Sequence, residues 1–247
     1  MFLRTAFLTI VISAICLPIG AQQGFKLQDG DTLVFLGDSI TQAGTQAEGY
    51  ITLFDLFCGV NGYEVKIINA GIGGHKSNDM LARLDKDVLA HKPDWVSVSC
   101  GVNDVWHSFN PKLKGVPLPD YKKNMTQIID KIQQTGAKVL LLTATPIHEN
   151  LQSEENKKLA VYNAFLRDFA KERGLLLCDL SKAFHDRLSK KMFPDKKLLT
   201  TDGVHMNPRG NRLMARSIVM SLGATYQERR RAENRWELVN NIVEMGE

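Results

Sequence analysis

Three side chains suited to acyl-transfer chemistry stand in two clusters far apart in the chain. Ser39 ends a Gly-Asp-Ser triplet, and an Asp-Gly-Val-His segment places Asp202 and His205 much nearer the C-terminus. A serine hydroxyl becomes a good nucleophile when a base takes its proton, and an imidazole oriented by a carboxylate is such a base near neutral pH. Three positions of separation let Asp202 and His205 project from one loop toward one point. The pattern predicts an ester hydrolase in which Ser39 attacks, His205 moves the proton and Asp202 orients the imidazole.

Each of these residues also has an ordinary structural explanation. A serine that follows a strand is often the N-cap of the next helix, which would account for Ser39. His205 could be a loop histidine bonded to the backbone, and Asp202 a turn residue before a glycine. The catalytic interpretation is favoured because one chain contains all three residue types that a serine nucleophile requires: the serine, its base and the carboxylate that orients the base.

An attacked ester carbonyl also needs hydrogen-bond donors in place for the charge that develops on its oxygen. The candidates are the backbone N–H of Ser39, the backbone N–H of Gly74 and the side-chain amide of Asn103. Gly74 carries no side chain, so a substrate can approach its N–H closely; its alternative role is a turn position with positive φ. Asn103 donates without any change of protonation, and its alternative role is to close a turn with Asp104.

The elements that must position these residues alternate between apolar runs of strand length and longer amphipathic stretches. Runs rich in Val, Ile and Leu with little polar alternation are typical of buried parallel strands. The expected strands are Thr32–Leu36, Val65–Asn69, Trp95–Cys100, Lys138–Thr143 and Leu175–Cys178. The expected helices are Tyr50–Val60, a helix capped by Ser77, Pro119–Gln134, Glu154–Arg173 and a last helix with Pro208 in its first turn.

This alternation predicts an open α/β sandwich with a parallel sheet of about five strands, covered by helices on both faces. In such sheets, sites form beyond the carboxyl ends of the strands. The segments that hold Ser39, Gly74 and Asn103 follow the first three expected strands, so we expect them to converge on one edge. Residues 108–118 read as an irregular loop near that edge.

The chain divides into an N-terminal targeting segment, one domain and a tail. Residues 1–21 have the charged start, short apolar stretch and small-residue end of a signal peptide, so we expect an exported protein with no stable membrane insertion after cleavage. A lipoprotein anchored at Cys16 or an uncleaved anchor is the alternative. Residues 22–223 form the predicted hydrolase domain, and residues 224–247 a charged helical extension.

Composition limits the possible functions. The 247 residues are 44% hydrophobic and 23% charged, with a formal net charge of +4. Because the basic residues are spread among acidic ones, a nucleic-acid partner is not expected. Cys58, Cys100 and Cys178 remain after signal removal, and we expect neither a disulfide framework nor a catalytic thiol. The six histidines lack metal-ligand spacing, so no metal site is expected.

Four segments in order resemble the SGNH/GDSL hydrolase superfamily. They are Gly37-Asp38-Ser39, Asn69-Ala70-Gly71-Ile72-Gly73-Gly74, Gly101-Val102-Asn103-Asp104 and Asp202-Gly203-Val204-His205. The resemblance runs from about Thr32 to Leu222. It implies a three-layer α/β/α sandwich with a flavodoxin-like sheet, no metal and no organic cofactor. It also implies that Ser39 is the nucleophile, that Asp202 and His205 complete the triad, and that Gly74 and Asn103 are oxyanion donors; Gly74 is chosen because it stands five positions after Asn69.

The superfamily resemblance leaves the substrate open. Trp106, His107, Phe109 and Tyr50 fall near the expected edge, and aromatic rings with polar neighbours suit a sugar face or ordinary packing. No long apolar lid for an acyl chain is evident. We therefore expect an acylated small molecule or polysaccharide as substrate, most simply an acetylated carbohydrate. The alternatives are a short-chain acyl esterase, lysophospholipase or thioesterase, and a non-catalytic carbohydrate-binding protein on the same scaffold.

Overall fold

The computed structural model describes residues 24–190 and 197–245, so the predicted signal peptide, residues 1–21, lies outside the described residues. Its centre is a parallel five-stranded sheet in the order β2-β1-β3-β4-β5. The strands are β1 (Thr32–Gly37), β2 (Lys66–Gly71), β3 (Trp95–Ser99), β4 (Lys138–Leu142) and β5 (Leu176–Cys178). The predicted α/β fold with a parallel sheet is confirmed, and each strand lies within two residues of its predicted bounds.

Helices connect the strands in the alternating pattern that the sequence predicts. They are α1 (Ser39–Gln42), α2 (Tyr50–Asn61), α3 (Ser77–Asp87), α4 (Val102–Trp106), α5 (Leu118–Gln134), α6 (Glu154–Glu172), α7 (Leu180–Leu188), α8 (Pro208–Ser221) and α9 (Tyr226–Met245). Short 3₁₀ turns lie at Ala43–Thr45, Leu89–His91 and His107–Phe109. The expectation that Ser77 caps its helix is wrong: the N-cap is Lys76, and the Ser77 hydroxyl instead donates to Asp104 at 2.6 Å.

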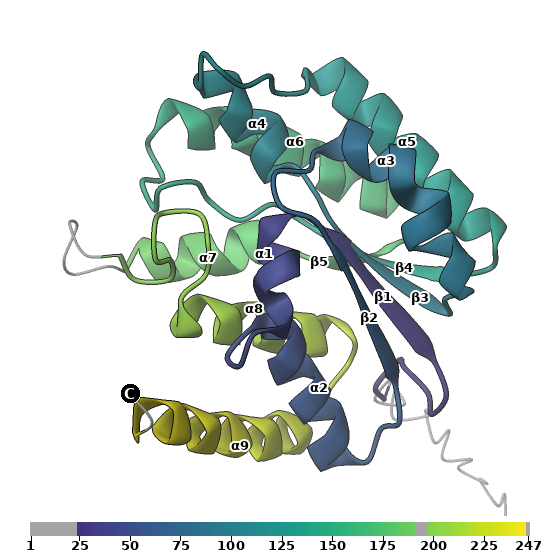
Figure 1. Ribbon diagram of the computed structural model, residues 1–247, viewed down its shortest axis with the longest axis vertical. Helices are drawn as coiled ribbons and strands as arrows, with labels where there is room; N and C mark the ends of the chain where they lie inside the picture. Colours follow the sequence, from purple (N-terminus) through teal and green to yellow (C-terminus); the bar gives the residue numbers. More distant parts are fainter. Residues whose placement is uncertain (1–23, 191–196, 246–247) are drawn as a thin grey trace, which may run out of the picture.

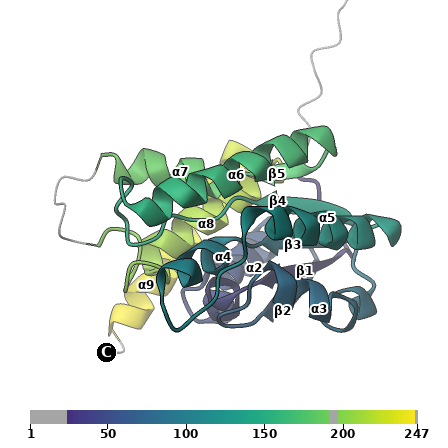
Figure 2. The ribbon, with the colours of Figure 1, turned by 90° about the horizontal axis from the view of Figure 1, so that it is seen from above.

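The helices form a layer on each face of the sheet. Helices α3, α5 and α6 cover one face, and α2 and α8 cover the other (Figure 1). Viewed from above, α3, α5 and α6 lie side by side over the strands (Figure 2). This division follows from right-handed crossovers, because the chain steps from β1 to β2 in one direction and from β2 through β3 to β5 in the other. Strands covered on both faces must be apolar throughout, and β1 is buried from Leu33 to Gly37.

The charged C-terminal extension forms α9, which packs on α2 and α8 on the side away from the sheet (Figure 1). The Trp236 side chain is buried, and its indole N–H donates to the Leu53 carbonyl at 2.9 Å. The Asn61 amide donates to the Glu228 carbonyl at 3.2 Å, and Tyr63 donates to the Glu228 carboxylate. Helix α9 therefore closes the apolar face of α2.

Two further features of the described residues bear on the sequence predictions. The thiols of Cys58, Cys100 and Cys178 are buried, and burial raises the pKa of the Cys58 and Cys178 thiols to about 12. Reactive thiols instead have lowered pKa values. Within residues 24–190 and 197–245, no helix combines the length and apolar character needed to cross a membrane.

Candidate active site

The three residues singled out in two distant sequence clusters meet at the carboxyl edge of the sheet. The Ser39 hydroxyl lies 2.9 Å from Nε2 of His205, and Nδ1 of His205 lies 2.5 Å from Oδ2 of Asp202. A carboxylate can only accept, so Nδ1 carries the proton and Nε2 is left to accept from Ser39. Burial alone would raise the pKa of Asp202, but hydrogen bonds from the His205 ring and the backbone N–H groups of Val204 and His205 lower it to about 2. The carboxylate is thus ionised throughout the neutral range.

Close backbone packing sets the position of Ser39. The serine begins α1 directly after β1, and the Asp38 carboxylate caps that helix by accepting from the Ile40 N–H at 3.0 Å. Helix α1 packs so tightly on the end of β2 that a Cβ at Gly71 would stand 2.2 Å from the Gln42 nitrogen. Only glycine fits this contact, so the Asn-Ala-Gly segment supports the nucleophile turn mechanically.

The Asp38 carboxyl is buried directly beside Ser39. Burial raises its pKa to about 6, although the hydrogen bond from Ile40 acts in the opposite direction. The carboxylate of Asp104 also raises the pKa of Asp38, and His205 lowers it.

The glycine loop after β2 presents one unused donor. The Gly71 N–H donates to Oδ1 of Asn69 at 2.8 Å, and the Gly73 N–H donates to Oε1 of Gln42 at 3.0 Å. Among the described residues, the Gly74 N–H has no acceptor, and a Cβ on Gly74 would meet no atom within 4 Å. Gly74 thus has both a spare donor and open space in front of it, which agrees with its choice over Gly71 and Gly73.

The Asn103 side chain is fixed with one N–H left for a ligand. Asn103 lies in the first turn of α4, is 3% exposed, and donates from Nδ2 to the His75 carbonyl at 3.1 Å. A side-chain amide has two N–H donors, so the second remains available. The Ser39 N–H is also without a helical acceptor, because it belongs to the first residue of α1. The structure therefore collects the three predicted donors around the end of the sheet.

Arg83 links two of these loops and was not identified from the sequence. Its side chain, 10% exposed, donates from Nη2 to the Gly37 carbonyl at 2.9 Å and from Nε to Nδ1 of His75 at 3.0 Å. A third nitrogen pairs with Asp87 at 3.3 Å. Burial, and then the nearby Arg83 charge, lower the pKa of His75, so its ring stays neutral and accepts from Arg83. Arg83 thus fixes the strand end before Ser39 relative to the loop that leads to Gly74.

Glu149 anchors the catalytic loop and was also missed. Its carboxylate accepts from the N–H groups of Leu198, Leu199 and Thr200 at 2.7 to 2.8 Å, and from the Thr200 hydroxyl at 2.8 Å. Burial would raise the pKa of Glu149, but these hydrogen bonds lower it. Nothing in the sequence points to this role, because the carboxylate and its partners are about fifty positions apart.

His148 holds the other side of the same loop. Its N–H donates to the Gly203 carbonyl at 2.7 Å, and a Cβ on Gly203 would stand 2.8 Å from Nδ1 of His148. Gly203 also has a φ of +109°, which few other residues tolerate. The backbone N–H of Thr201 donates to the His205 carbonyl at 2.9 Å. The loop between Asp202 and His205 is therefore tightly constrained.

The aromatic residues predicted near the edge separate into two groups. Trp106 lies edge-on to His148 at 5.9 Å between ring centroids, His107 lines a groove beside Gly74, and Phe109 is 43% exposed. Tyr50 does not belong with them: its ring is completely buried, and its hydroxyl donates to Oγ1 of Thr41 at 3.0 Å. The tyrosine begins α2 and packs inward under the nucleophile helix, so it cannot contact a sugar.

A groove of about 1010 Å³ starts at the unused Gly74 N–H. It runs between residues 73–79, which comprise the glycine loop and the first turn of α3, the segment 107–117 and the first half of α5, and polar or charged side chains form most of its wall. Its apolar side chains include Leu113 and Val116, too few to form a continuous channel for a long acyl chain. Within the described part of the chain, no three His, Cys, Asp or Glu side chains are grouped to hold a metal ion.

A family model described as the GDSL-like lipase/acylhydrolase family matches residues 35–213, which span the whole site. The chain belongs to this GDSL family. The predicted superfamily membership is confirmed, and the chain is a GDSL-type esterase. The match includes the Gly-Asp-Ser triplet and the Asp202–His205 loop, which the fold brings together.

Several GDSL relatives share most of this chain. The acetylxylan esterase of Geobacillus stearothermophilus is 30% identical over 214 residues, which cover 80% of this chain and 96% of that protein. Its crystal structure superimposes with a TM-score of 0.73 at 29% identity, over 81% of this chain and 97% of that one. An acetyl xylan esterase named AlAXEase gives a TM-score of 0.70 at 36% identity, over 76% and 97%.

A second kind of relative has a name that describes different activities. Thioesterase 1/protease 1/lysophospholipase L1 of Escherichia coli strain K12 is 30% identical over 118 residues, which cover 48% of this chain and 53% of that protein. The chain is thus similar to acetylxylan esterases over about four fifths of its length and to this enzyme over about half. Family membership establishes the ester hydrolase and leaves the acyl group and the alcohol open.

Proposed function

We propose that this chain is an exported serine esterase that removes acetyl groups from carbohydrate. The observation that carries the proposal is the hydrogen-bonded series from Asp202 through His205 to the Ser39 hydroxyl. The glycine loop with the unused Gly74 N–H adjoins Ser39, since a Cβ on Gly73 would stand 3.8 Å from the Ser39 Cβ. A nucleophile with its base and a donor for the developing oxyanion are the parts that acyl transfer requires.

The proposed mechanism has two half-reactions. His205 takes the Ser39 proton through Nε2 while Oγ attacks the acetyl carbonyl, and the new negative charge on oxygen is stabilised by the Ser39 and Gly74 N–H groups and the Asn103 amide. His205 then gives its proton to the departing sugar oxygen, which leaves as an alcohol and an acetyl-serine remains. Water, deprotonated by the same imidazole, attacks this ester; the bond to Ser39 Oγ breaks, acetate is released, and His205 returns the proton to Oγ. Asp202 keeps the imidazole in the correct tautomer during both steps.

The groove beside Gly74 favours a carbohydrate over a long acyl chain. Its wall offers hydrogen-bonding side chains such as Asn78, Asn124 and Gln127, which can pair with sugar hydroxyls. The similarity to acetylxylan esterases over about four fifths of this chain supports the same choice. Xylan fragments acetylated on their hydroxyls are therefore the first substrates to examine.

The test compares acyl groups and alcohols on the purified protein. Released acetate is measured from acetylated xylooligosaccharides and from p-nitrophenyl acetate, and turnover of p-nitrophenyl octanoate and lysophosphatidylcholine is measured in parallel. We expect the acetyl substrates to be preferred and Ser39→Ala to remove their turnover, while Ser189→Ala, at an exposed serine just after α7, leaves it unchanged. Preference for the long-chain substrates would replace this proposal with the lysophospholipase alternative. Sugar binding without hydrolysis by the unaltered protein would favour a binding protein.

The proposal of export rests on residues 1–21, whose charged start and apolar stretch are typical of a signal peptide. Expression of the full chain in a bacterial host should give a mature protein that begins at residue 22 in the periplasm or medium. N-terminal sequencing and fractionation measure this directly. An uncleaved chain in the cytoplasmic fraction would contradict it, and recovery with lipid on Cys16 would replace it with the lipoprotein alternative.

A further inference from the structure

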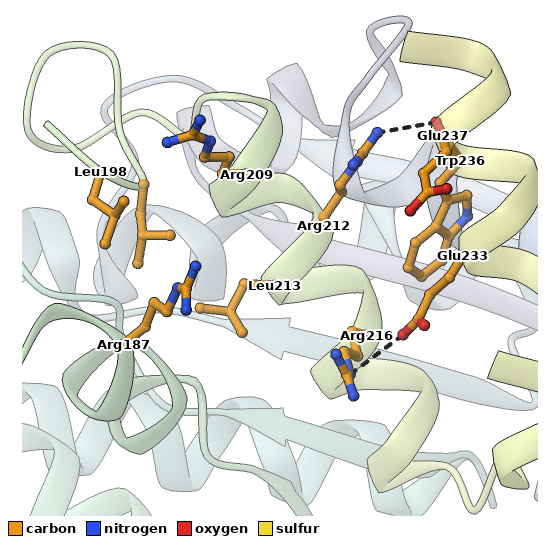
Figure 3. A pocket seen from close by; sticks show the side chains of 10 residues that line it. Arg187, Leu198, Arg209, Arg212, Leu213, Arg216, Glu233, Trp236 and Glu237 are labelled. Atoms are coloured by element: carbon orange, nitrogen blue, oxygen red, sulfur yellow. Dashed lines mark hydrogen bonds and ion pairs between the residues drawn. The ribbon is translucent and has the colours of Figure 1, made fainter. Parts of the chain in front are cut away.

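A second hollow lies on the other side of the catalytic loop, between α7, α8 and α9. It has a volume of about 490 Å³ and shares no lining residue with the groove beside Gly74. We call it the arginine groove, because four arginines line it: Arg187 of α7 and Arg209, Arg212 and Arg216 of α8. Figure 3 shows these side chains around the hollow, with α9 along one side.

The charges of the arginine groove are unbalanced at one end. On the α9 side, Nε of Arg216 lies 3.5 Å from the Glu233 carboxylate, and Nη2 of Arg212 donates to the Trp236 carbonyl at 3.1 Å. At the other end, neither Arg187 nor Arg209 has an ion pair or side-chain hydrogen bond with any residue that the structure describes. Two guanidinium groups without a carboxylate partner among the described residues thus line this hollow, whose own carboxylates, Glu233 and Glu237, belong to α9.

A second observation concerns Arg212, which lies between these two ends. Its Nε is buried and, among the described residues, has no hydrogen-bond partner. A buried donor that is left unpaired destabilises the protein, because it has lost its hydrogen bonds to water without gaining others. The four arginines therefore differ in their access to water: the Nε of Arg212 is removed from solvent and still lacks a hydrogen-bond acceptor among the described residues.

The wall between the arginines is apolar. Leu198 and Leu213 lie beside Arg187 in the hollow, and the buried Trp236 forms the side toward α9 (Figure 3). An apolar wall lowers the local dielectric, so charge-assisted hydrogen bonds at its edge are stronger than on an open surface. Arginine presents a planar set of donors that matches the oxygen pairs of carboxylate and phosphate.

We propose that the arginine groove binds an organic oxyanion, a carboxylate or a phosphate, between Arg187 and Arg209. The oxyanion would accept from both guanidinium groups, and the carbon skeleton of the ligand would lie on Leu198 and Leu213. The two sources of this chemistry are an acidic sugar of the uronate class and a sugar phosphate. Neither source is the acetylated substrate of the proposed esterase site, which adjoins the other groove at Gly74.

The site would contact both stems of the catalytic loop. Leu198 and Leu199 precede Asp202, and Arg209 follows His205; the Asn207 N–H joins the two stems by donating to the Leu199 carbonyl at 3.0 Å. A ligand held between Arg209 and Leu198 therefore adds contacts across the base of this loop. Because it binds the folded protein and not the unfolded chain, it raises the thermal midpoint with increasing ligand concentration.

The experiment uses calorimetric titration and thermal unfolding of the whole protein with galacturonate, glucose 6-phosphate and, as a neutral control, galactose. We expect one or both acids to bind and to raise the midpoint while galactose does neither; the acid that binds identifies the source. Binding should weaken about tenfold between low and high salt, because ions screen exposed charges.

A matched pair of double variants locates the binding site. Arg187→Gln with Arg209→Gln removes the two unpaired cations, and Arg230→Gln with Arg235→Gln makes the same change of charge at exposed positions of α9. We expect the first pair to weaken acid binding at least about tenfold and the second to leave it unchanged. Hydrolysis of p-nitrophenyl acetate should be the same in all forms. Absence of acid binding, or equal weakening by both pairs, would overturn the proposal, and the salt series decides the matter if the first pair fails to fold.

Discussion

Replacing Glu149 by glutamine should lower both stability and kcat, although Glu149 does not belong to the predicted triad. The carboxylate is 8% exposed and holds the segment 198–200 that leads to Asp202. Its Oε1 accepts three hydrogen bonds, and its Oε2 accepts the Leu198 N–H. The glutamine oxygen can keep the first three as weaker neutral bonds, whereas its NH₂ group would face the Leu198 N–H, donor against donor.

The expected loss can be worked out from this geometry. One charge-assisted bond is lost and three are weakened, and each such bond contributes about 1.5–3 kcal/mol at most. We expect Glu149→Gln to lower the free energy of unfolding by about 2–4 kcal/mol at neutral pH. Because the folded-state pKa of Glu149 is lowered, its stabilisation is present above the unfolded pKa, near 4.5, and is lost as the pH falls through the folded value. The difference between variant and parent should therefore shrink at acid pH.

The assay pairs urea unfolding with kcat and KM for p-nitrophenyl acetate. We expect kcat to fall about ten- to hundredfold with KM little changed, because a displaced Asp202 misdirects the imidazole after substrate has bound. Glu172→Gln, the same change at an exposed position at the end of α6, should alter neither measurement. If Glu149→Gln unfolds like the parent, the carboxylate does not hold the segment. If stability falls and kcat does not, the position of the triad is independent of this anchor.

Three other changes test separate parts of the site. Asp202→Asn should lower kcat by about 10³–10⁴-fold with little change in KM, because an amide at this position favours the wrong tautomer of His205. Steady-state kinetics measure both constants, and a loss of kcat below tenfold contradicts the assigned role. Asp38→Asn should keep the helix cap and flatten the pH dependence of stability. Because the folded pKa of about 6 lies above the ordinary 3.8, the free energy of unfolding of the parent should fall by up to about 3 kcal/mol as the pH rises from 4 to 6. Urea titrations measure this slope, and an equal slope in the variant would refute the reasoning. Gly71→Ala should lower the free energy of unfolding by about 3 kcal/mol or more, because its Cβ would overlap the backbone of α1. Gly59→Ala, in open space on α2, should raise the free energy of unfolding by about 0.5–1 kcal/mol. Equal thermal midpoints of the two variants would contradict the close packing.

The sequence predicts the framework of this site because the framework is encoded locally. Apolar runs identify the five strands, and the polar residues that follow them lie at the sheet edge for topological reasons alone. The positions of Ser39, Asp202 and His205 follow from residue type and order, although their roles remain a prediction for the variants above to test. Gly74 could be selected by spacing, and the structure adds the reason why its neighbours have no free N–H.

What the sequence does not reveal depends on contacts between distant positions. Arg83 reaches the Gly37 carbonyl 46 positions away, and nothing in an amphipathic helix marks one arginine as buried. Glu149 stands in a loop and takes a left-handed φ of +52° that no local pattern indicates. The prediction that Tyr50 lies near the substrate was wrong for the same physical reason. An aromatic residue at the start of a helix can turn outward or inward, and the Tyr50 ring turns inward to pack against Phe35.

The packing of α9 on α2 has a consequence for the order of synthesis. The surface of α2 that receives Trp236 emerges from the ribosome early, and the tryptophan that covers it follows 183 positions after Leu53. Until α9 has emerged, that strip of α2 lacks this native partner, so the nascent chain carries an apolar patch that chaperones can bind. A stop codon just before α9 would make this exposure permanent, and the shortened chain should aggregate even though every residue of its catalytic loop is intact.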